Sequence, residues 1–372
     1  MYSVGKSVSK ALLSEFYGKL SKVFMMSADD IDVSVIIPIH NAGQWLDECL
    51  ESLSQQQHTL NVEVSLFLDS CTDSSQAIVE DCWTSRLEDI GYIVTVSKED
   101  NGTPKGVGYA KNRAVEQSRG KYLCFLDSDD TMLPQRIQKQ YELAYLNTNA
   151  IVVDQATPPD STVRYAKWAN ELNKTQLNIQ VYTSHGPTVI MPTWFCHRNV
   201  FDSVGGFSEA GKGTPEDLIF FYKHIGNGGK IIRHDDELLM YRYHPHATTF
   251  SIHEQTIWDL RIQELQEKVL KNWDTFTIWN AGKQGRKFYR SLTKENQRKV
   301  TAFCDVDAKK VGSCYTYEET KEKPKPKVPI IHFSEAKAPL IICMKMELTG
   351  GQFEENLRSL HLEEGKDYHH FN

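Results

Sequence analysis

GVGYAKNRAVEQSRGKYLCFLDSDD, residues 106–130, is the stretch that decides the fold. In its first half Ala110, Ala114 and Val115 recur at helical spacing, and Gly120 marks the end of that helix. The apolar run at residues 122–126 is short and lies between Gly and Asp residues, which favours a buried strand. We therefore predict a helix, then a buried strand, then an acidic loop.

The acidic loop is the first candidate site. Asp127, Asp129 and Asp130 follow the predicted strand directly, and open α/β sheets bind their ligands at the carboxyl ends of strands. Carboxylates this close together repel one another unless a cation offsets their charge. A divalent metal bound through oxygen and shared with a diphosphate would do so. The alternative is a solvated loop in which one Asp caps a helix.

The surrounding sequence predicts an α/β fold. Branched apolar runs at residues 33–39, 62–68 and 92–96 alternate with helical patterns at 45–53 and 77–87. This alternation is typical of a mostly parallel sheet. Residues 38–41 and Asp69 then follow the first and second strands, so we expect them to lie at the same sheet edge as the acidic loop.

Composition and charge set the domain organisation. A chain of 372 residues suggests two domains. It contains no apolar run long enough to span a membrane. Its eight cysteines are scattered along the sequence, which is typical of a cytoplasmic protein. Residues 271–372 carry 18 Lys and Arg against 14 Asp and Glu, a net charge of +4 within a chain of net charge −7. We expect four segments: an N-terminal extension that could form an amphipathic helix (1–30), a catalytic domain (31–253), a linker helix (254–272) and a C-terminal domain (273–372).

Three motifs together resemble the nucleotide-binding half of a family 2 glycosyltransferase with the GT-A fold. They are VSVIIPIHNAGQWLDECLESL, the loop at residues 69–73 and the stretch at 106–130, and the resemblance extends over roughly residues 31–250. It implies that Asp127 lies towards the ribose of a UDP-sugar and that Asp129 binds Mn²⁺ or Mg²⁺. The donor-binding residues it implies are Pro38, His40, Asn41, Asp69, Lys111, Asp127, Ser128 and Asp129.

The chain departs from the family pattern at three points. Leu68 occupies the position of a usual acid, which leaves Asp69 as the acidic contact to uracil. Lys111 replaces a common Arg and is a candidate partner of the diphosphate, although a Lys is a point charge and not a fork. The Gln-x-x-Arg-Trp signature of processive synthases is absent, which implies a single transfer.

A second acidic motif supplies the candidate base. In GGFSEAGKGTPEDLIFFYK, residues 205–223, Glu216 and Asp217 follow Pro215 in the first turn of a predicted helix. An inverting transfer needs one ionised carboxylate to take the proton of the acceptor hydroxyl. The resemblance assigns that role to Asp217 and places Glu216 on the acceptor side. The alternative is that both acids serve only the helix dipole.

Two further residues have a functional and a structural interpretation. His244 lies in LLMYRYHPHATT (238–249), which resembles a family segment whose His binds the metal or the diphosphate; a core or surface role is the alternative. Trp194 lies in TSHGPTVIMPTWFCHR (183–198), which resembles the segment that places the acceptor. Trp194 could stack on a sugar or belong to the core.

The C-terminal region reads as a small Rossmann-like unit. FTIWNAGKQGRKFYRSL (276–292) predicts a strand, a glycine turn and a helix, and VTAFCDVDAKKVG (300–312) predicts another strand. Gly282 and Gly285 form only a truncated dinucleotide fingerprint, so NAD is an open alternative ligand. Lys283, Arg286 and Lys287 begin the helix and are candidate contacts to acceptor phosphates.

The phrases FTIWNAGKQGR, TAFCDVD and LTGGQFEENLRSLHLEEGKD resemble the glycosyltransferases that move galactose from UDP-galactose onto queuosine in the tRNA anticodon loop. That resemblance implies a tRNA acceptor and a cytoplasmic enzyme, and a basic tail is compatible with RNA. Two alternatives stay open. One is a UDP-GlcNAc-dependent β-1,3-N-acetylglucosaminyltransferase acting on a glycan, and the other is a nucleotide-sugar-binding protein without catalysis.

Overall fold

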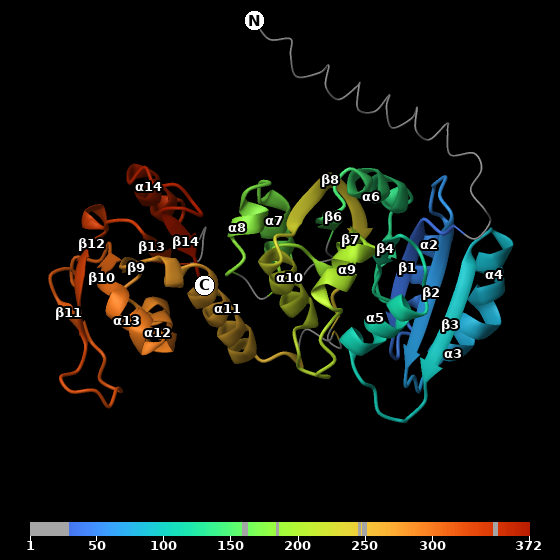
Figure 1. Cartoon of the computed structure of the whole chain (residues 1–372), viewed down its shortest axis with the longest axis horizontal. Coiled ribbons are helices and arrows are strands. Elements are labelled where there is room, and N and C mark those ends of the chain that lie inside the picture. The colour runs from blue at the N-terminus through green and yellow to red at the C-terminus, as the bar shows by residue number, and fades with distance from the viewer. Residues whose placement is uncertain (1–29, 158–162, 184–185, 245–246, 248–250, 345–348) are drawn as a thin grey trace, which may run out of the picture.

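The computed structural model describes residues 30–157, 163–183, 186–244, 247, 251–344 and 349–372. The predicted N-terminal helix lies outside the described residues. Two β-sheets lie side by side along the long axis of the molecule, each covered by helices (Figure 1). The predicted α/β class, with a second and smaller sheet domain, is confirmed. None of the helices in the described residues is long and apolar enough to cross a membrane.

The first sheet is mixed, and its strands lie in the order β3-β2-β1-β4-β7-β6-β8-β5. Neighbours from β3 to β4 are parallel, whereas β7 runs antiparallel to both β4 and β6. The predicted third strand, 92–96, is confirmed with later bounds. The strands are β1 (Val33–Ile39), β2 (Val62–Asp69), β3 (Ile93–Glu99), β4 (Tyr122–Phe125), β5 (Thr131–Met132), β6 (Ala150–Thr157), β7 (Phe195–His197) and β8 (Lys230–Met240).

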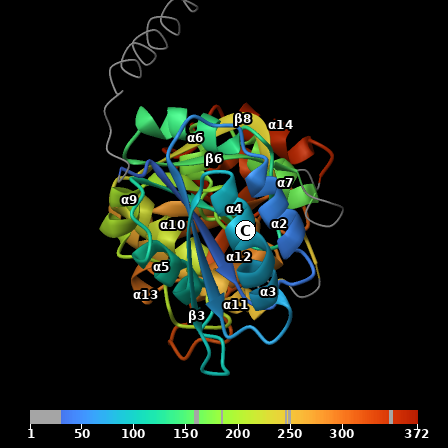
Figure 2. The same cartoon turned by 90° about the vertical axis from the view of Figure 1, so that its right-hand side faces the viewer.

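Helices cover both faces of this sheet, with α2, α3 and α4 on one face and α5 and α9 on the other (Figure 2). The helix predicted at 77–87 forms, but its middle is a π-helical turn, η1 (Ile78–Trp83). The helices are α2 (Leu46–Ser54), α3 (Ser75–Ala77), α4 (Thr84–Asp89), α5 (Val107–Glu116), α6 (Arg136–Tyr145), α7 (Val163–Glu171), α8 (Gln176–Ile179), α9 (Arg198–Val204) and α10 (Glu216–Gly226), with a 3₁₀ turn η2 (Met191–Thr193).

Strand register brings the predicted polar clusters to one edge. Val33 at the start of β1 pairs with Val62 of β2 and with Tyr122 of β4, so the three parallel strands end close together. Every residue of β1 and β2 is buried, because helices pack on both faces of these strands. The loops after β1, β2 and β4 therefore emerge together at the carboxyl edge, where ligands of α/β sheets bind.

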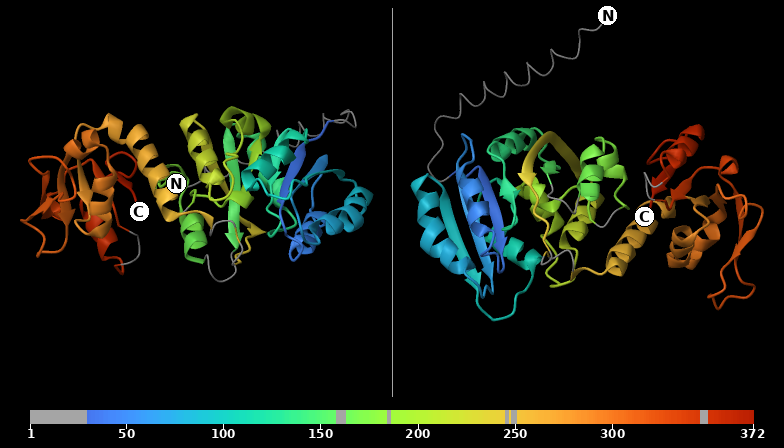
Figure 3. Two further views of the ribbon diagram at one scale, coloured as in Figure 1. Left: turned by 90° about the horizontal axis from the view of Figure 1, so that it is seen from below. Right: turned by 180° about the vertical axis from the view of Figure 1, so that it is seen from behind.

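The helix α11 (Glu254–Lys268), followed by the 3₁₀ turn η4 (Leu270–Asn272), runs between the two sheets (Figure 3). Its residues Ile257, Trp258, Ile262 and Leu265 are buried in one continuous apolar cluster. That cluster also contains residues of α5 and α10 on one side and of the C-terminal sheet on the other. The two domains consequently share a hydrophobic core.

The C-terminal sheet has the strand order β11-β12-β10-β9-β13-β14 and is parallel except for the edge strand β11. Without β11 this is the doubly wound order expected of a Rossmann-like unit. Its elements are β9 (Phe276–Trp279), α12 (Lys283–Ser291), α13 (Lys294–Lys299), β10 (Val300–Asp305), β11 (Cys314–Thr316), β12 (Lys327–His332), η5 (Phe333–Glu335), β13 (Leu340–Ile342), α14 (Gln352–Ser359) and β14 (Tyr368–His370).

Candidate active site

The acidic loop forms a tight turn directly after β4. The backbone N–H of Asp130 donates to the carbonyl of Asp127 at 3.1 Å, and Asp130 itself is 1% exposed. Burial, together with the charge of Asp127, raises the pKa of Asp129, and burial together with Asp129 and Asp127 raises that of Asp130 well above its usual range. Among the described residues, Asp127 Oδ1 and Asp130 Oδ2 are buried and accept no hydrogen bond. The loop therefore concentrates negative charge that the protein only partly offsets.

Residues after β8 hold the acidic loop from the other side. The backbone N–H of Arg242 donates to Asp130 Oδ1 at 2.7 Å, and its Nε donates to the carbonyl of Asp129 at 2.8 Å. The Arg242 guanidinium also pairs with Glu48 of α2. Arg242 thus ties the end of β8 to α2 across the loop. No sequence pattern predicted this role of Arg242.

His244 lies beside Asp129, as the predicted metal pair requires. Its Nε2 is 2.8 Å from Asp129 Oδ2, and its ring lies 4.0 Å from the ring of Trp45 between centroids. In the described part of the chain no three His, Cys, Asp or Glu side chains already form a metal cage. An imidazole next to a carboxylate, with a buried Asp130 oxygen nearby that accepts no hydrogen bond in the described residues, is nevertheless a donor set that suits Mn²⁺.

The loops after β1 and β2 are pinned to each other. Asn41, which adopts a positive φ of 51°, accepts a hydrogen bond from the backbone N–H of Thr72 at 2.7 Å. His40 Nδ1 lies 2.6 Å from the carbonyl oxygen of Asp69, while Pro38 is buried within β1. His40 and Asn41 are exposed at this edge and Ser128 is 9% exposed. Their contacts to a donor stay predictions.

Asp69 has a structural role that the sequence did not indicate. Its carboxylate accepts hydrogen bonds from the backbone N–H groups of Lys105 at 3.0 Å and Gly106 at 2.8 Å, and the residue is 1% exposed. Asp69 therefore fixes the backbone at the start of α5. Contact between Asp69 and uracil stays a prediction.

Lys111 on α5 is buried, with its side chain 2% exposed. Its Nζ lies 3.5 Å from Asp127 Oδ1, 3.3 Å from Glu216 Oε1 and 3.0 Å from the Met191 sulfur. The predicted contact with a donor diphosphate is not available in this arrangement, because the ammonium group is enclosed and directed at protein carboxylates. Lys111 instead connects the acidic loop to the start of α10.

The candidate base lies where the sequence predicts it, in the first turn of α10. Asp217 Oδ1 accepts a hydrogen bond from the backbone N–H of Leu218 at 2.7 Å. Burial and the neighbouring charge of Glu216 raise the pKa of Asp217 to about 7, although Lys111 opposes that shift. A carboxylate with a pKa near 7 is well matched to taking a proton at neutral pH.

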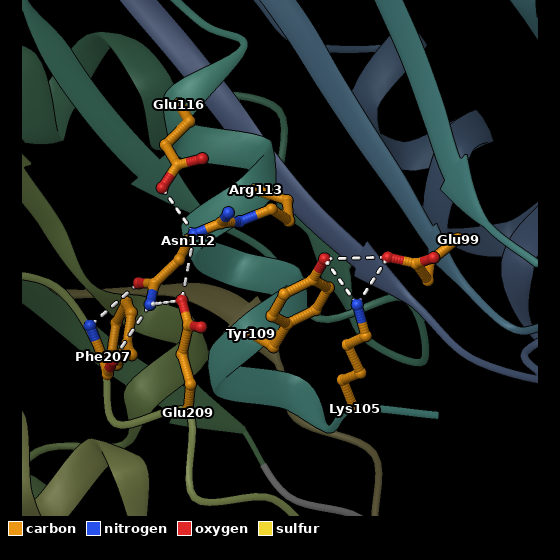
Figure 4. A network of polar contacts seen from close by, with 8 residues as sticks. All are labelled: Glu99, Lys105, Tyr109, Asn112, Arg113, Glu116, Phe207 and Glu209. Atoms are coloured by element: carbon orange, nitrogen blue, oxygen red, sulfur yellow. Dashed lines mark hydrogen bonds and ion pairs between the residues drawn. The ribbon is translucent and has the colours of Figure 1, made fainter. Parts of the chain in front are cut away.

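A polar network fixes α5 against the segments on either side of it (Figure 4). Asn112 donates to the carbonyl of Phe207 and accepts from its N–H, both at 2.9 Å. At the start of the helix, Lys105 and Tyr109 both bond Glu99 at the end of β3. Farther along the helix, Arg113 pairs with Glu116 and Glu209. These bonds fix α5, and with it Lys111, relative to the chain that leads into α10.

One predicted acceptor contact, Trp194, differs from expectation. Trp194 is 1% exposed and packs among Phe207, Phe220 and Phe221. It presents no ring face to an acceptor sugar, so the stacking interpretation is wrong and the core interpretation is correct. The other candidate contacts, Lys283, Arg286 and Lys287, belong to α12 in the C-terminal domain, where Arg286 lies 5.2 Å from the ring of Tyr315 and Lys287 3.8 Å from the ring of Trp258.

A buried ion pair beneath the acidic loop was not predicted. Arg136 at the start of α6 is fully buried and donates through Nη2 to the carbonyls of Phe125 at 2.8 Å and Pro192 at 2.6 Å. Asp154 Oδ2 lies 3.5 Å from Arg136 Nε, and burial raises the pKa of Asp154 to about 7 against the opposing charge of Arg136. Arg136 thus joins the end of β4 to the 191–193 turn. An Arg in an amphipathic helix normally lies on the solvent-exposed face, so no sequence pattern predicted that Arg136 is buried.

Known proteins share the part of the chain that carries these loops. A sequence profile described as Glycosyl transferase family 2 matches residues 34–205, which run from β1 to the end of α9. Residues 34–205 are therefore similar to a family 2 glycosyltransferase domain. The match includes the acidic loop and Lys111, and it ends before α10 and Asp217. The protein is therefore a glycosyltransferase that acts on a nucleotide-sugar donor.

Relatives and solved structures agree with this domain assignment. The uncharacterized glycosyltransferase EpsJ of Bacillus subtilis is 25% identical over 264 residues, which cover 69% of this chain and 74% of EpsJ. The glycosyltransferase GlyG of Streptococcus pneumoniae is 32% identical over 110 residues, 30% of this chain and 34% of GlyG. Residues 1–349 of S. aureus TarS, solved in complex with UDP-GlcNAc, superpose with a TM-score of 0.50 at 18% identity, covering 72% of each chain. The predicted GT-A fold is confirmed.

Proposed function

We propose that this protein is an inverting glycosyltransferase that moves galactose from UDP-galactose onto queuosine in the anticodon loop of tRNA, in the cytoplasm. The observation that best supports a transfer reaction is that carboxylate groups from two distant parts of the chain lie close together. Asp127 of the acidic loop and Glu216 at the start of α10 both contact Lys111, and Asp217 follows Glu216 directly. A donor-side acid and a candidate base thereby share one site.

Each candidate site residue has a separate role in the proposed transfer. Asp217 accepts the proton of the attacking acceptor hydroxyl, for which its pKa of about 7 suits it. Asp129 and His244 would hold Mn²⁺, and Asp127 would lie towards the ribose of the donor. A bound Mn²⁺ supplies positive charge that stabilises UDP as the leaving group. One displacement by the acceptor hydroxyl inverts the configuration at the sugar carbon.

The acceptor proposal is supported by the C-terminal domain. Its tail phrases resemble those of queuosine-modifying galactosyltransferases, and residues 283–327 carry 13 Lys and Arg against 6 Asp and Glu. Lys321, Lys323 and Lys325 are exposed on the segment between β11 and β12, as are Lys327 at the start of β12 and Lys294 on α13. Exposed lysines on one segment form a surface suited to phosphate backbones.

The deciding experiment measures UDP release with Mn²⁺. UDP-galactose and UDP-GlcNAc, the latter being the ligand of the TarS complex, are each offered with tRNA that contains queuosine and with the same tRNA lacking it. We expect release only from UDP-galactose and only with the queuosine tRNA. Release from UDP-GlcNAc regardless of tRNA would contradict the proposal and favour the glycan-directed alternative.

Replacing the candidate base separates catalysis from simple binding of the nucleotide sugar. Asp217→Asn should lower turnover by roughly 10²- to 10⁴-fold while UDP binding is kept, since the lost group acts only as the base. A protein that merely binds nucleotide sugars would show no turnover in the wild type either.

Replacing Lys321, Lys323 and Lys325 together by Ala should weaken tRNA binding and reduce its dependence on salt, without changing UDP affinity. Salt-independent tRNA binding by the wild type would contradict the proposed RNA surface.

A further inference from the structure

Lys111 is a buried cation at the junction of three segments. Its Nζ lies within 3.5 Å of Asp127, which follows β4, and of Glu216, which begins α10. The sulfur of Met191, in the turn before β7, lies 3.0 Å from the same nitrogen. One ammonium group therefore contacts the donor side of the site, the helix that carries the base and the 191–193 turn.

The packing around α5 keeps Lys111 in place. One turn earlier, a Cβ on Gly108 would come within 2.2 Å of the Ser208 carbonyl and 3.3 Å of the Glu216 side chain, so α5 and the start of α10 are in close contact. One residue later, Asn112 is bonded on both sides to the backbone of Phe207. The Lys111 side chain cannot swing towards solvent without breaking this contact between the helices.

The charges around Lys111 favour its protonated form. Burial alone would lower the pKa of Lys111, but Asp127, Glu216 and Asp217 raise it overall. The ammonium in turn favours ionised Asp217, whereas burial and Glu216 favour its neutral form. The charge of Asp127 also favours neutral Asp217, and the charge of Asp217 in turn raises the pKa of Tyr165 of α7. Lys111 is therefore the cation that opposes the neutralisation of the base.

We propose that Lys111 is a positioning residue that links the acidic loop to α10 and keeps the Asp217 carboxylate ionised, and that it does not bind the diphosphate of the donor. This inference rests on the proposed role of Asp217 as base. Lys111 then acts on turnover through the charge of Asp217. Donor affinity depends on the partly buried carboxylates of the acidic loop, Asp127 and Asp129, and on the metal.

Two neutralising variants give opposite expectations. Lys111→Met keeps the length of the side chain and removes its charge, so the acidic limb of the pH profile of kcat should move up by about one pH unit or more. Glu216→Gln removes the nearest negative charge and should move the same limb down. Both variants break the contact between Lys111 and Glu216. Damage to structure alone would therefore change both in the same direction.

The measurement is kcat against pH from 5.5 to 9.5 for wild type, Lys111→Met, Lys111→Arg and Glu216→Gln, with the dissociation constants of UDP and UMP. For Lys111→Met we expect a loss of kcat of about eightfold or more at pH 6.5 that is recovered near pH 9, with UDP still preferred over UMP by the wild-type ratio. Lys111→Arg should restore the wild-type limb.

Two results would overturn the inference. A selective loss of UDP affinity in Lys111→Met, down to that of UMP, would return Lys111 to the diphosphate. An acidic limb that stays unmoved while kcat falls equally at every pH would reduce Lys111 to a structural contact. Failure of the underlying function is distinguishable, because in that case Asp217→Asn would keep wild-type turnover.

Discussion

The two sheets of this protein have similar carboxyl edges, but the protein hydrogen-bonds the acidic side chains fully at one edge and only partly at the other. In both, a polar turn follows the central strand and an acid follows a neighbouring parallel strand. At the end of β10, Asp305 accepts hydrogen bonds from the N–H groups of Ala281 and Asp307 and from Lys310 Nζ, each at 3.0 Å. After β4, by contrast, Asp130 Oδ2 is buried and accepts no hydrogen bond in the described residues, and neither does Asp127 Oδ1, which lies 3.5 Å from the Lys111 ammonium.

The pKa values follow the same division. Burial alone would raise the pKa of Asp305, but hydrogen bonds from the Asp307 N–H and from Lys310 lower it overall. Burial and neighbouring acids raise the pKa of Asp129 and Asp130 without equal compensation. Buried carboxylates are normally satisfied by the protein, so an unsatisfied group indicates a ligand or ion. The first edge has the character of a site and the second that of a scaffold.

The largest expected effect comes from removing one acid at each edge. Asp129→Asn should lower kcat/KM by roughly 10²- to 10³-fold, because it weakens charge stabilisation of the leaving UDP. Asp305→Asn, the matched control, should leave kcat/KM within twofold and reduce only stability. Steady-state kinetics with UDP-galactose and tRNA measure both, with chelation by EDTA expected to reproduce the Asp129→Asn loss. Equal activity losses in the two variants would remove the distinction between site and scaffold.

The second effect is the pH dependence of turnover. Because the pKa of Asp217 is raised to about 7, its carboxylate is ionised above pH 7 and neutral below it. We expect kcat to rise about tenfold per pH unit between pH 5 and 6.5 and to level off above pH 8. Asp305→Asn should leave the profile unchanged. A profile flat from pH 5 to 8 would contradict the assignment of Asp217 as base.

The sequence predicted the carboxyl edge of the first sheet better than the side chains that support it. Strand periodicity and the acidic triplet are local patterns, and they located β1, β4 and the Asp127–Asp130 turn correctly. Lys111 is a sequence candidate for the diphosphate, and Trp194 is one for either a sugar or the core, and both are buried. Burial depends on how α5, α10 and the segment around Phe207 pack around these side chains, and neither the spacing nor the type of a residue encodes that packing.

Arg136 shows the same limit from the opposite direction. The sequence places it in a polar helical pattern that is typical of solvent exposure. In the fold, β4 and the 191–193 turn direct two backbone carbonyls at one point, and the guanidinium satisfies both. A fork of donors matches that geometry as a Lys would not. Such a role becomes visible only after tertiary packing brings residues 125 and 192 together.

A smaller effect, on stability, is expected at the glycine turn that follows β9 in the C-terminal sheet. A Cβ on Gly285 would lie 1.8 Å from the carbonyl oxygen of Asn280, so the close approach of α12 to the end of β9 requires glycine. Gly285→Ala should destabilise the C-terminal domain by about 2 kcal/mol or more. Hydrogen exchange in β9 and α12 would detect this, with Gln284→Ala as the neighbouring control. Unchanged protection would mean that the turn relaxes easily and that Gly285 has a different purpose.

The smallest effect lies where the second domain contacts the first. His369 packs against the ring of Tyr182, and burial lowers its pKa to about 4 despite the nearby Glu364. The neutral imidazole is thus favoured in the folded state, so its contribution to stability is fully present above pH 6.5 and is lost as pH falls towards 4. Glu364 itself accepts hydrogen bonds from Gln176 and Gln180 of the first domain, at 3.2 and 2.8 Å.

We therefore expect the melting temperature of the wild type to fall between pH 6.5 and 4 by a few degrees more than that of His369→Gln, which has no proton to gain there. His361→Asn, at an exposed position where Asn tolerates the positive φ of 52°, should follow the wild type. Parallel curves for all three proteins would show that the second domain is held without help from the neutral imidazole. The shared apolar cluster around α11 would then account for its attachment to the first domain.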